Sequence, residues 1–137
     1  MIRRAEARDI DRLIEIRGAV RENRLRDPGS VTRDDYLWFL SRSRIWLAEV
    51  SGRIAGFSAS DPRDGTIWAL FVDPGQEGAG LGTDLLGQAC RDLKADGHGE
   101  ARLCTDPGTR AARFYRKLGW QEEGDAPDGE QRFRLRL

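Results

Sequence analysis

Apolar residues along the chain recur at two spacings, which divide it into predicted helices and strands. Helical spacing is found in four stretches, expected to begin within residues 6–9, at Thr32, at Leu81 and at Asp106 or Thr109. Strand-like runs lie at residues 2–5, 44–50, 53–60, 66–72, 100–104, 120–123 and 131–137. The predicted order is β-α-α-β-β-β-α-β-α-β-β. This order indicates a mixed α/β sheet flanked by helices, in one domain covering residues 1–137.

Local signals refine several of these elements. Thr32 and Asp35 have the spacing of a capping box, and Gly97 is expected to end the third helix. Ser51-Gly52 is typical of a two-residue hairpin turn. Residues 66–72 are apolar almost throughout, which predicts a central strand covered on both faces. The residues expected on buried helix faces are Ile10, Leu13, Ile14, Val20, Leu37, Leu40, Leu81, Leu85, Leu86, Ala89, Cys90 and Leu93.

Composition excludes several classes of function. The 23 basic and 23 acidic side chains cancel, so no general positive field points to nucleic acid. No apolar run approaches the roughly 18 residues of a membrane span, and the N-terminus lacks a signal-peptide core. A cytoplasmic protein without a membrane partner is therefore expected. Cys90 and Cys104 are expected to be reduced core thiols, and a single histidine, His98, makes a metal site unexpected.

The strand at 66–72 runs into a glycine-rich turn and then a helix. Such a turn directs backbone N–H groups and the positive end of a helix dipole at one point, which suits a phosphate or pyrophosphate. A Walker A loop needs a lysine after its last glycine, where this chain has Thr83. Gly78, Gly80 and Gly82 do not have the spacing of the dinucleotide fingerprint. From spacing alone, a tight turn without a ligand stays open.

Two segments together point to a family. Val72-x-Pro74 followed by Gly78-x-Gly80-Leu81-Gly82 resembles motif A of the GNAT superfamily of N-acetyltransferases, whose loop wraps the pyrophosphate of coenzyme A. Residues 110–120 resemble that family's Ala-x-x-Phe-Tyr-x-Lys-x-Gly-Phe/Trp segment. The resemblance covers nearly the whole chain and is most specific at 66–97 and 108–120. It implies a mostly antiparallel sheet of six or seven strands, splayed at its centre and flanked by about four helices.

The resemblance also implies acetyl-CoA as co-substrate. The cofactor-binding residues that it implies are Leu70, Phe71, Val72, Glu77, Gly78, Ala79, Gly80, Leu81, Gly82, Thr83, Gly108, Ala111 and Tyr115. The chain departs from the family at Glu77, where Gln or Arg is usual, and at Gly108, where asparagine is common. Because a carboxylate beside a pyrophosphate is unfavourable, the backbone of residues 78–83 is expected to carry the binding.

Acyl transfer from a thioester to an amine needs a neutral amine, a donor for the carbonyl oxygen and an acid for the thiolate. The resemblance implies that the backbone at residues 70–72 pairs with the pantetheine arm and that Tyr115 protonates the thiolate. The alternative for Tyr115 is a core aromatic residue. Glu22 is the candidate base, and its alternative is a solvated charge at a helix end, with water taking the proton instead.

The acceptor would be bound by the first two helices and the edges of the sheet. Candidate substrate contacts are Arg17, Asn23, Trp38, Trp46 and Trp68, although each tryptophan is also a candidate for core packing. Arg12, Arg17 and Arg21 are most simply interpreted as a solvated helix face. Edge strands at residues 120–137 could pair two copies, so a homodimer stays open.

The functional hypothesis is acetyl transfer from acetyl-CoA to a primary amine of a small molecule or peptide, by direct attack. One alternative is a catalytically silent acyl-CoA-binding or regulatory module, which the departures at Glu77 and Gly108 keep open. The other is a structural interaction domain that does not bind coenzyme A.

Overall fold

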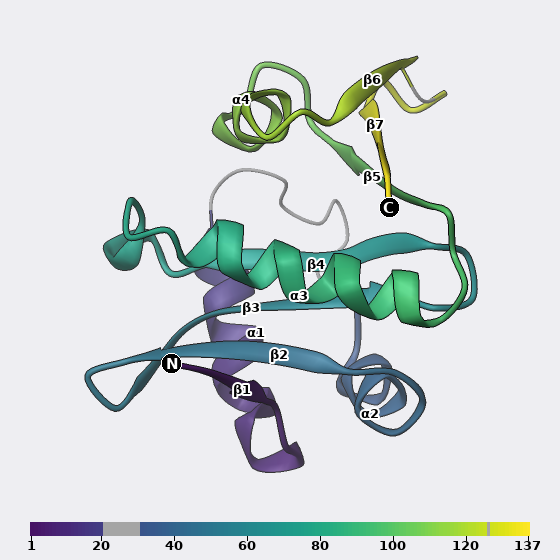
Figure 1. The fold of residues 1–137 in the computed structure, drawn as a ribbon. Coiled ribbons are helices and arrows are strands. Elements are labelled where there is room, and N and C mark those ends of the chain that lie inside the picture. The colour runs from purple at the N-terminus through teal and green to yellow at the C-terminus, as the bar shows by residue number, and fades with distance from the viewer. Residues whose placement is uncertain (21–30, 126) are drawn as a thin grey trace.

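Seven strands form one mixed sheet in the computed structural model, which describes residues 1–20, 31–125 and 127–137 (Figure 1). The sheet order is β1-β2-β3-β4-β5-β7-β6. The strands are β1 (Ile2–Arg4), β2 (Ile45–Val50), β3 (Arg53–Asp61), β4 (Thr66–Val72), β5 (Glu100–Thr105), β6 (Gln121–Asp125) and β7 (Gln131–Arg136). The helices are α1 (Ile10–Ala19), α2 (Arg33–Arg42), α3 (Leu81–Ala95) and α4 (Arg110–Lys117), with short 3₁₀ turns at Ala7–Asp9 and Pro74–Gln76. This order of strands and helices confirms the predicted one.

The predicted boundary signals are also present. The Thr32 side chain accepts a hydrogen bond from the Asp35 N–H, while the Asp35 carboxylate accepts one from the Thr32 N–H at 2.7 Å. Ser51 and Gly52 both have positive φ, 52° and 78°, as a tight hairpin turn of matching twist requires. Gly97, with φ 94°, ends α3 in a Schellman motif, because the His98 N–H bonds the Leu93 carbonyl.

Two predicted core positions are wrong. Ile14 is 42% exposed and Leu37 is 40% exposed, whereas Ile16, Tyr36 and Phe39 are buried. Successive helix residues are about 100° apart, so a face centred on Leu13 turns Ile14 toward solvent. The predicted stripe on α3 is confirmed at Leu85, Leu86, Ala89 and Leu93, while Leu81 and Cys90 are half-buried.

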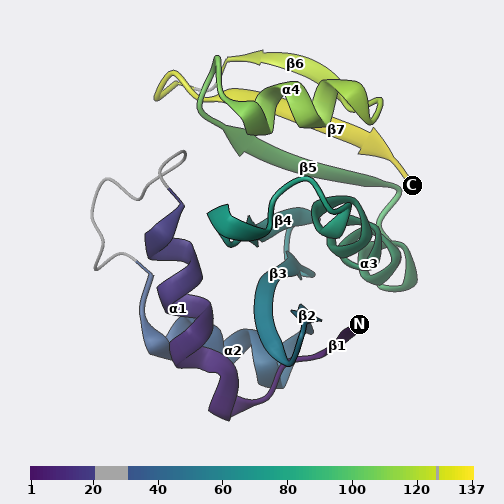
Figure 2. The ribbon, with the colours of Figure 1, turned by 90° about the vertical axis from the view of Figure 1, so that its left-hand side faces the viewer.

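The helices cover the two halves of the sheet differently. Figure 2 shows α1 and α2 on one side of β2, β3 and β4, and α3 on the other side. One buried cluster lies under α1 and α2 and includes Leu13, Phe39 and Phe57. A second cluster joins α3 and α4 to β5 and β7 through residues such as Leu93 and Phe133. No helix in the described ranges is long and apolar enough to cross a membrane.

The sheet is nearly interrupted between β4 and β5. These two strands are parallel, and their pairing is limited to Thr66 opposite Arg102, whereas β3 and β4 pair over six positions. The Arg102 N–H donates to the Gly65 carbonyl at 3.0 Å. In Figure 1 the part formed by β5, β7, β6 and α4 accordingly stands apart from the part formed by β1 to β4. The expected splay is therefore present.

Candidate functional site

A bulge in β4 shapes the site. Ala59 lies opposite Ala69 and Ser60 lies opposite Ile67, so Trp68 is an extra residue in β4. A bulge bends its strand and reorients its side chains. Trp68 and Ala69 consequently both pack with the cluster under α1 and α2, while Leu70 packs with the cluster of α3 and α4.

A cavity of about 310 Å³ is lined by β4 and β5 beyond their last paired residues. Its lining residues are Arg17, Ile67, Trp68, Ala69, Leu70, Phe71, Leu103, Cys104, Thr105, Asp106, Ala111, Tyr115, Asp128 and Glu130. They come from both faces of the sheet: Trp68 and Phe71 face α1 and α2, whereas Leu70 and Leu103 face α3 and α4. The cavity therefore lies between residues of both faces of the sheet.

Two polar groups in the cavity wall have unused hydrogen-bonding capacity. Thr105 is 2% exposed, and its buried Oγ1 atom has no hydrogen-bond partner among the described residues. The Nε and Nη1 atoms of Arg17 are in the same condition. Since buried polar groups in native proteins are nearly always paired with protein or water, these atoms are available to water or to a polar ligand.

The glycine-rich turn is positioned by Asp73. The Asp73 carboxylate accepts a hydrogen bond from the Gly75 N–H at 3.1 Å and one from the Arg12 guanidinium at 2.7 Å. These two bonds, the Gly75 N–H foremost, lower the pKa of Asp73. Arg12 also donates to the Ile54 carbonyl, so it connects α1 to β3 and to the end of β4. The start of the turn is thereby fixed relative to the sheet.

The turn then presents an anion site. Gly78 and Gly80 have φ values of 87° and 79°, which glycine adopts without strain. Gly80 precedes α3, so the N–H groups of residues 81–83 belong to a first helical turn and lack intrahelical acceptors. Residues 75–80 are exposed. Together with the helix dipole, these donors suit a phosphate or pyrophosphate.

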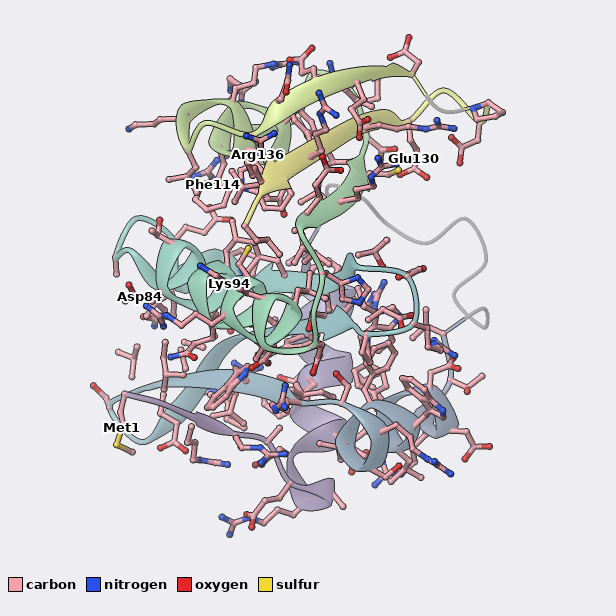
Figure 3. All side chains as sticks on the ribbon, turned by 45° about the vertical axis from the view of Figure 1, so that its right-hand side comes forward. Met1, Asp84, Lys94, Phe114, Glu130 and Arg136 are labelled. Atoms are coloured by element: carbon pink, nitrogen blue, oxygen red, sulfur yellow. The ribbon has the colours of Figure 1, made fainter. Side chains whose placement is uncertain are left out.

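Glu77 does not point freely into solvent. Its carboxylate forms an ion pair with Arg110, the first residue of α4. The unfavourable charge of Glu77 is therefore offset, and the pair connects the turn to α4. Nearby, a Cβ added at Gly82 would lie 3.5 Å from the Phe114 ring, which Figure 3 shows between α4 and the start of α3. Gly108 has φ 74°, precedes the N-cap residue Thr109, and does not line the cavity.

Tyr115 lies in the core and also at the wall of the cavity. It is 6% exposed and packs against Phe114, Trp120 and Phe133, with ring centroids 5.4, 5.5 and 5.8 Å away. It also lines the cavity. Burial, more than the nearby Cys90, raises the pKa of Tyr115, so its phenol stays protonated at neutral pH. The residue is therefore a core aromatic, and its role as a proton donor stays a prediction.

Residues 10–120 match the sequence model of the Acetyltransferase (GNAT) family. The chain belongs to the GNAT family. It is 30% identical over 99 residues to serotonin N-acetyltransferase 2, chloroplastic, from Oryza sativa subsp. japonica, covering 67% of this chain and 48% of that protein. It is 32% identical over 105 residues to mycothiol acetyltransferase of Streptomyces avermitilis, covering 69% of this chain and 34% of that protein. The chain thus spans about half the length, or less, of these relatives.

Solved structures confirm the GNAT fold. A putative acetyltransferase from Salmonella typhimurium, solved with its cofactor acetyl-CoA, has a TM-score of 0.78 at 20% identity, covering 100% of this chain and 93% of that one. The PaiA N-acetyltransferase from Thermoplasma acidophilum, in complex with coenzyme A, has a TM-score of 0.76 at 18% identity, covering 100% and 98%.

The arginines on α1 depart from the expected solvated face. The guanidinium of Arg17 lies 4.7 Å from the centre of the Phe71 ring and 5.4 Å from that of Trp68. Arg12 is held by Asp73 and Ile54, as described above. Because α1 crosses the end of β4, both side chains turn onto the sheet. Arg21 lies outside the described residues, as do Glu22 and Asn23.

The tryptophans have separate environments. Trp68 lines the cavity and stacks on Phe39 with centroids 4.0 Å apart. Trp38 packs edge-on against Phe39 and under the guanidinium of Arg63, and it does not line the cavity. Phe39 itself is in the core. Trp46 donates its indole N–H to Asp92 at 2.7 Å.

The cysteine prediction is wrong for Cys104, which is exposed, because strand alternation turns it to the face of β5 opposite Leu103. Burial raises the pKa of Cys90 to about 11, so it is no ready nucleophile. The His98 ring bonds the Pro62 carbonyl, and the described residues contain no metal-ligand cluster.

Sequence reasoning missed Thr105, Asp106, Asp128 and Glu130, which line the cavity from the end of β5 and the β6–β7 turn. Figure 3 shows Glu130 where β7 begins, remote from Phe114. Their one signal was position, because all four are polar residues close to the end or the start of a predicted strand.

Proposed function

We propose that this GNAT-family domain transfers an acetyl group from acetyl-CoA to a primary amine of a small molecule or peptide, by direct attack. The observation that carries the proposal is the cavity between β4 and β5, which residues from both sheet faces line. Acetyl-CoA can enter it from the side of α3 and α4, and the amine from the side of α1. No covalent enzyme intermediate is then needed.

The residues present fit the cofactor. The amides of residues 78–83 hold its pyrophosphate, and the Glu77–Arg110 pair keeps a net negative charge away from it. Because β4 pairs with β5 only at Thr66, main-chain groups of Leu70, Phe71 and Val72 that face β5 have no strand partner there. They are available to the amides of the pantetheine arm. Thr105 Oγ1 offers one further hydrogen bond at the cavity wall.

The chemistry needs a proton donor and a proton acceptor. Tyr115 lines the cavity with a protonated phenol, so it is the proposed proton donor to the departing thiolate. Burial raises the pKa of Tyr115, which makes release of its proton harder than from an exposed tyrosine. Glu22, the candidate base from the sequence, lies outside the described residues. Within them, Asp128 and Glu130 line the cavity and can take the proton of the amine, directly or through water. A main-chain N–H of β4 polarises the thioester carbonyl.

The test combines binding and turnover. Calorimetry should show coenzyme A and acetyl-CoA binding to the purified chain, and chromatography should show acetyl-CoA consumed with one N-acetylated product per coenzyme A released. Direct product detection is preferable to a thiol reagent, because Cys104 is exposed. Binding without consumption, over a broad panel of primary amines, would indicate the silent acyl-CoA-binding module. Absence of binding would refute both the acetyltransferase and the silent acyl-CoA-binding module.

A further inference from the structure

Arg17 brings an unpaired positive charge to the wall of the cavity. It lies near the end of α1 and is half-buried over Phe71 and Trp68. Its Nε and Nη1 atoms have no hydrogen-bond partner within the described part of the chain. Aromatic faces attract a guanidinium but do not replace the acceptors that its N–H groups need.

The charge of Arg17 favours an anionic partner. A guanidinium has donors and no acceptor, and a cation partly withdrawn from water is unfavourable without a counter-charge. Tyr36 lies beside Arg17, but burial raises the pKa of Tyr36 and Arg17 opposes that rise only in part. The phenol therefore remains neutral. An anion that enters the cavity would supply the missing charge.

The cavity also has carboxylates in its wall. Asp128 and Glu130 line it. Partial desolvation of the thiol raises the pKa of Cys104 first, although the residue as a whole is exposed, and Glu130 and Asp128 raise it further. That effect locates them near the face of β5 that carries Cys104. Both have interactions of their own, so they are not free charges. A ligand in the cavity meets a guanidinium from α1 and carboxylates from the β6–β7 turn, which suits a molecule carrying both an anion and an amine.

We propose that the acceptor amine also carries a carboxylate, as in an amino acid or a peptide with a free C-terminus, and that Arg17 binds this carboxylate. The inference rests on the proposed acetyl transfer. A guanidinium is planar and presents paired N–H donors, which match the two oxygens of a carboxylate. An amine without the anion leaves Arg17 unpaired, so the site discriminates against it.

The test uses pairs of acceptors that differ in one group. The twenty amino acids and a set of dipeptides are each supplied with a free carboxylate and as the C-terminal amide, and kcat/KM is measured from the N-acetylated product. For the wild-type chain, the best acid should exceed its amide by about 10- to 100-fold. Arg17→Met keeps the apolar stem and should reduce that ratio toward one. The matched control, Arg8→Met, removes a 75% exposed arginine and should keep the wild-type ratio.

Several outcomes would overturn the proposal. They are equal rates for acids and amides, an acid preference that survives Arg17→Met, or acetyl-CoA binding with no carboxylate-bearing amine acetylated. If circular dichroism shows that Arg17→Met does not fold, Arg17→Lys replaces it. Because lysine keeps the positive charge but not the paired donors, Arg17→Lys should lower the acid-to-amide ratio only in part. Calorimetry with acetyl-CoA runs in parallel. Failure to bind acetyl-CoA refutes the proposed function, whereas binding with the wrong acceptor preference refutes only the role of Arg17.

Discussion

The two halves of the sheet are built differently, and the site lies where they meet. Strands β1 to β4 pair continuously and have helices on both faces. Strands β5, β7 and β6 have α4 on one face, while residues of the other face, such as Arg102 and Cys104, are exposed. One parallel pair, Thr66 opposite Arg102, joins the halves. The cavity therefore lies where β4 and β5 do not pair.

The largest effect is expected from the C-terminal half. Tyr115→Phe removes the proposed acid but keeps the ring that packs on Trp120 and Phe133. We expect kcat to fall about 100-fold, at the low end of the range for a positioned acid. The measurements are steady-state kinetics and calorimetry with acetyl-CoA, whose Kd should not change. An unchanged kcat would reduce Tyr115 to a packing residue.

The next effect belongs to the N-terminal half. Gly56 on β3 lies where an added Cβ would approach the Phe71 carbonyl oxygen to 2.8 Å and the Leu85 side chain to 3.2 Å. Gly56→Ala should therefore lower the free energy of unfolding by about 1–3 kcal/mol and weaken acetyl-CoA binding, because β4 must shift. Gly87→Ala on α3 is the control: no atom lies within 4 Å of its Cβ, and it should stabilise by about 0.5–1 kcal/mol. Urea unfolding measures both, and equal effects would contradict this account of β4.

A buried carboxylate on α3 gives a pH-dependent effect in the same half. Burial raises the pKa of Asp92, although the Trp46 indole and Arg44 oppose the rise. A carboxyl whose folded-state pKa is raised binds more protons in the folded chain, so its contribution to stability decreases as pH rises from about 3.8. Asp92→Asn keeps an acceptor for Trp46 and should raise Tm at pH 7 by a few degrees.

The difference in Tm between Asp92→Asn and the wild type should shrink as pH falls and be smallest below about pH 3, where Asp92 is protonated in both folded and unfolded chains. Thermal unfolding followed from about pH 2.5 to about pH 7 tests this. The subtraction cancels the contributions of Asp9, Asp61 and Asp73, whose pKa values are lowered. A variant less stable at pH 7 would show that the charge of Asp92 is net favourable.

The smallest effect concerns the ion pair that connects the halves. Glu77→Gln removes the negative charge beside the anion site and releases Arg110 from its pair. We expect the Kd for acetyl-CoA to fall about 3-fold at low salt, with less change at high salt. Glu122→Gln is the matched control, because Glu122 has similar exposure and pairs with Arg116 of the same helix. Weaker binding by Glu77→Gln would show that the pair positions the turn.

The sequence predicted elements whose signals are local. The capping box at Thr32, the hairpin at Ser51-Gly52 and the glycine turn before α3 depend on neighbouring residues, and all three are present. The environments of Arg17 and Cys104 depend on distant contacts: α1 crosses the end of β4, and one face of β5 lacks a helix. The Glu77–Arg110 pair spans 33 positions, so no local pattern could reveal it.

The central claim is that the unpaired gap between β4 and β5 is the place where acetyl group and amine meet. A crystal structure with acetyl-CoA tests it most directly. The account predicts the pyrophosphate on the amides of residues 78–83, the pantetheine arm along residues 70–72, and the acetyl group in the cavity within reach of Tyr115. The claim would be contradicted if acetyl-CoA bound away from this gap, with its thioester outside the cavity that Tyr115 and Arg17 line.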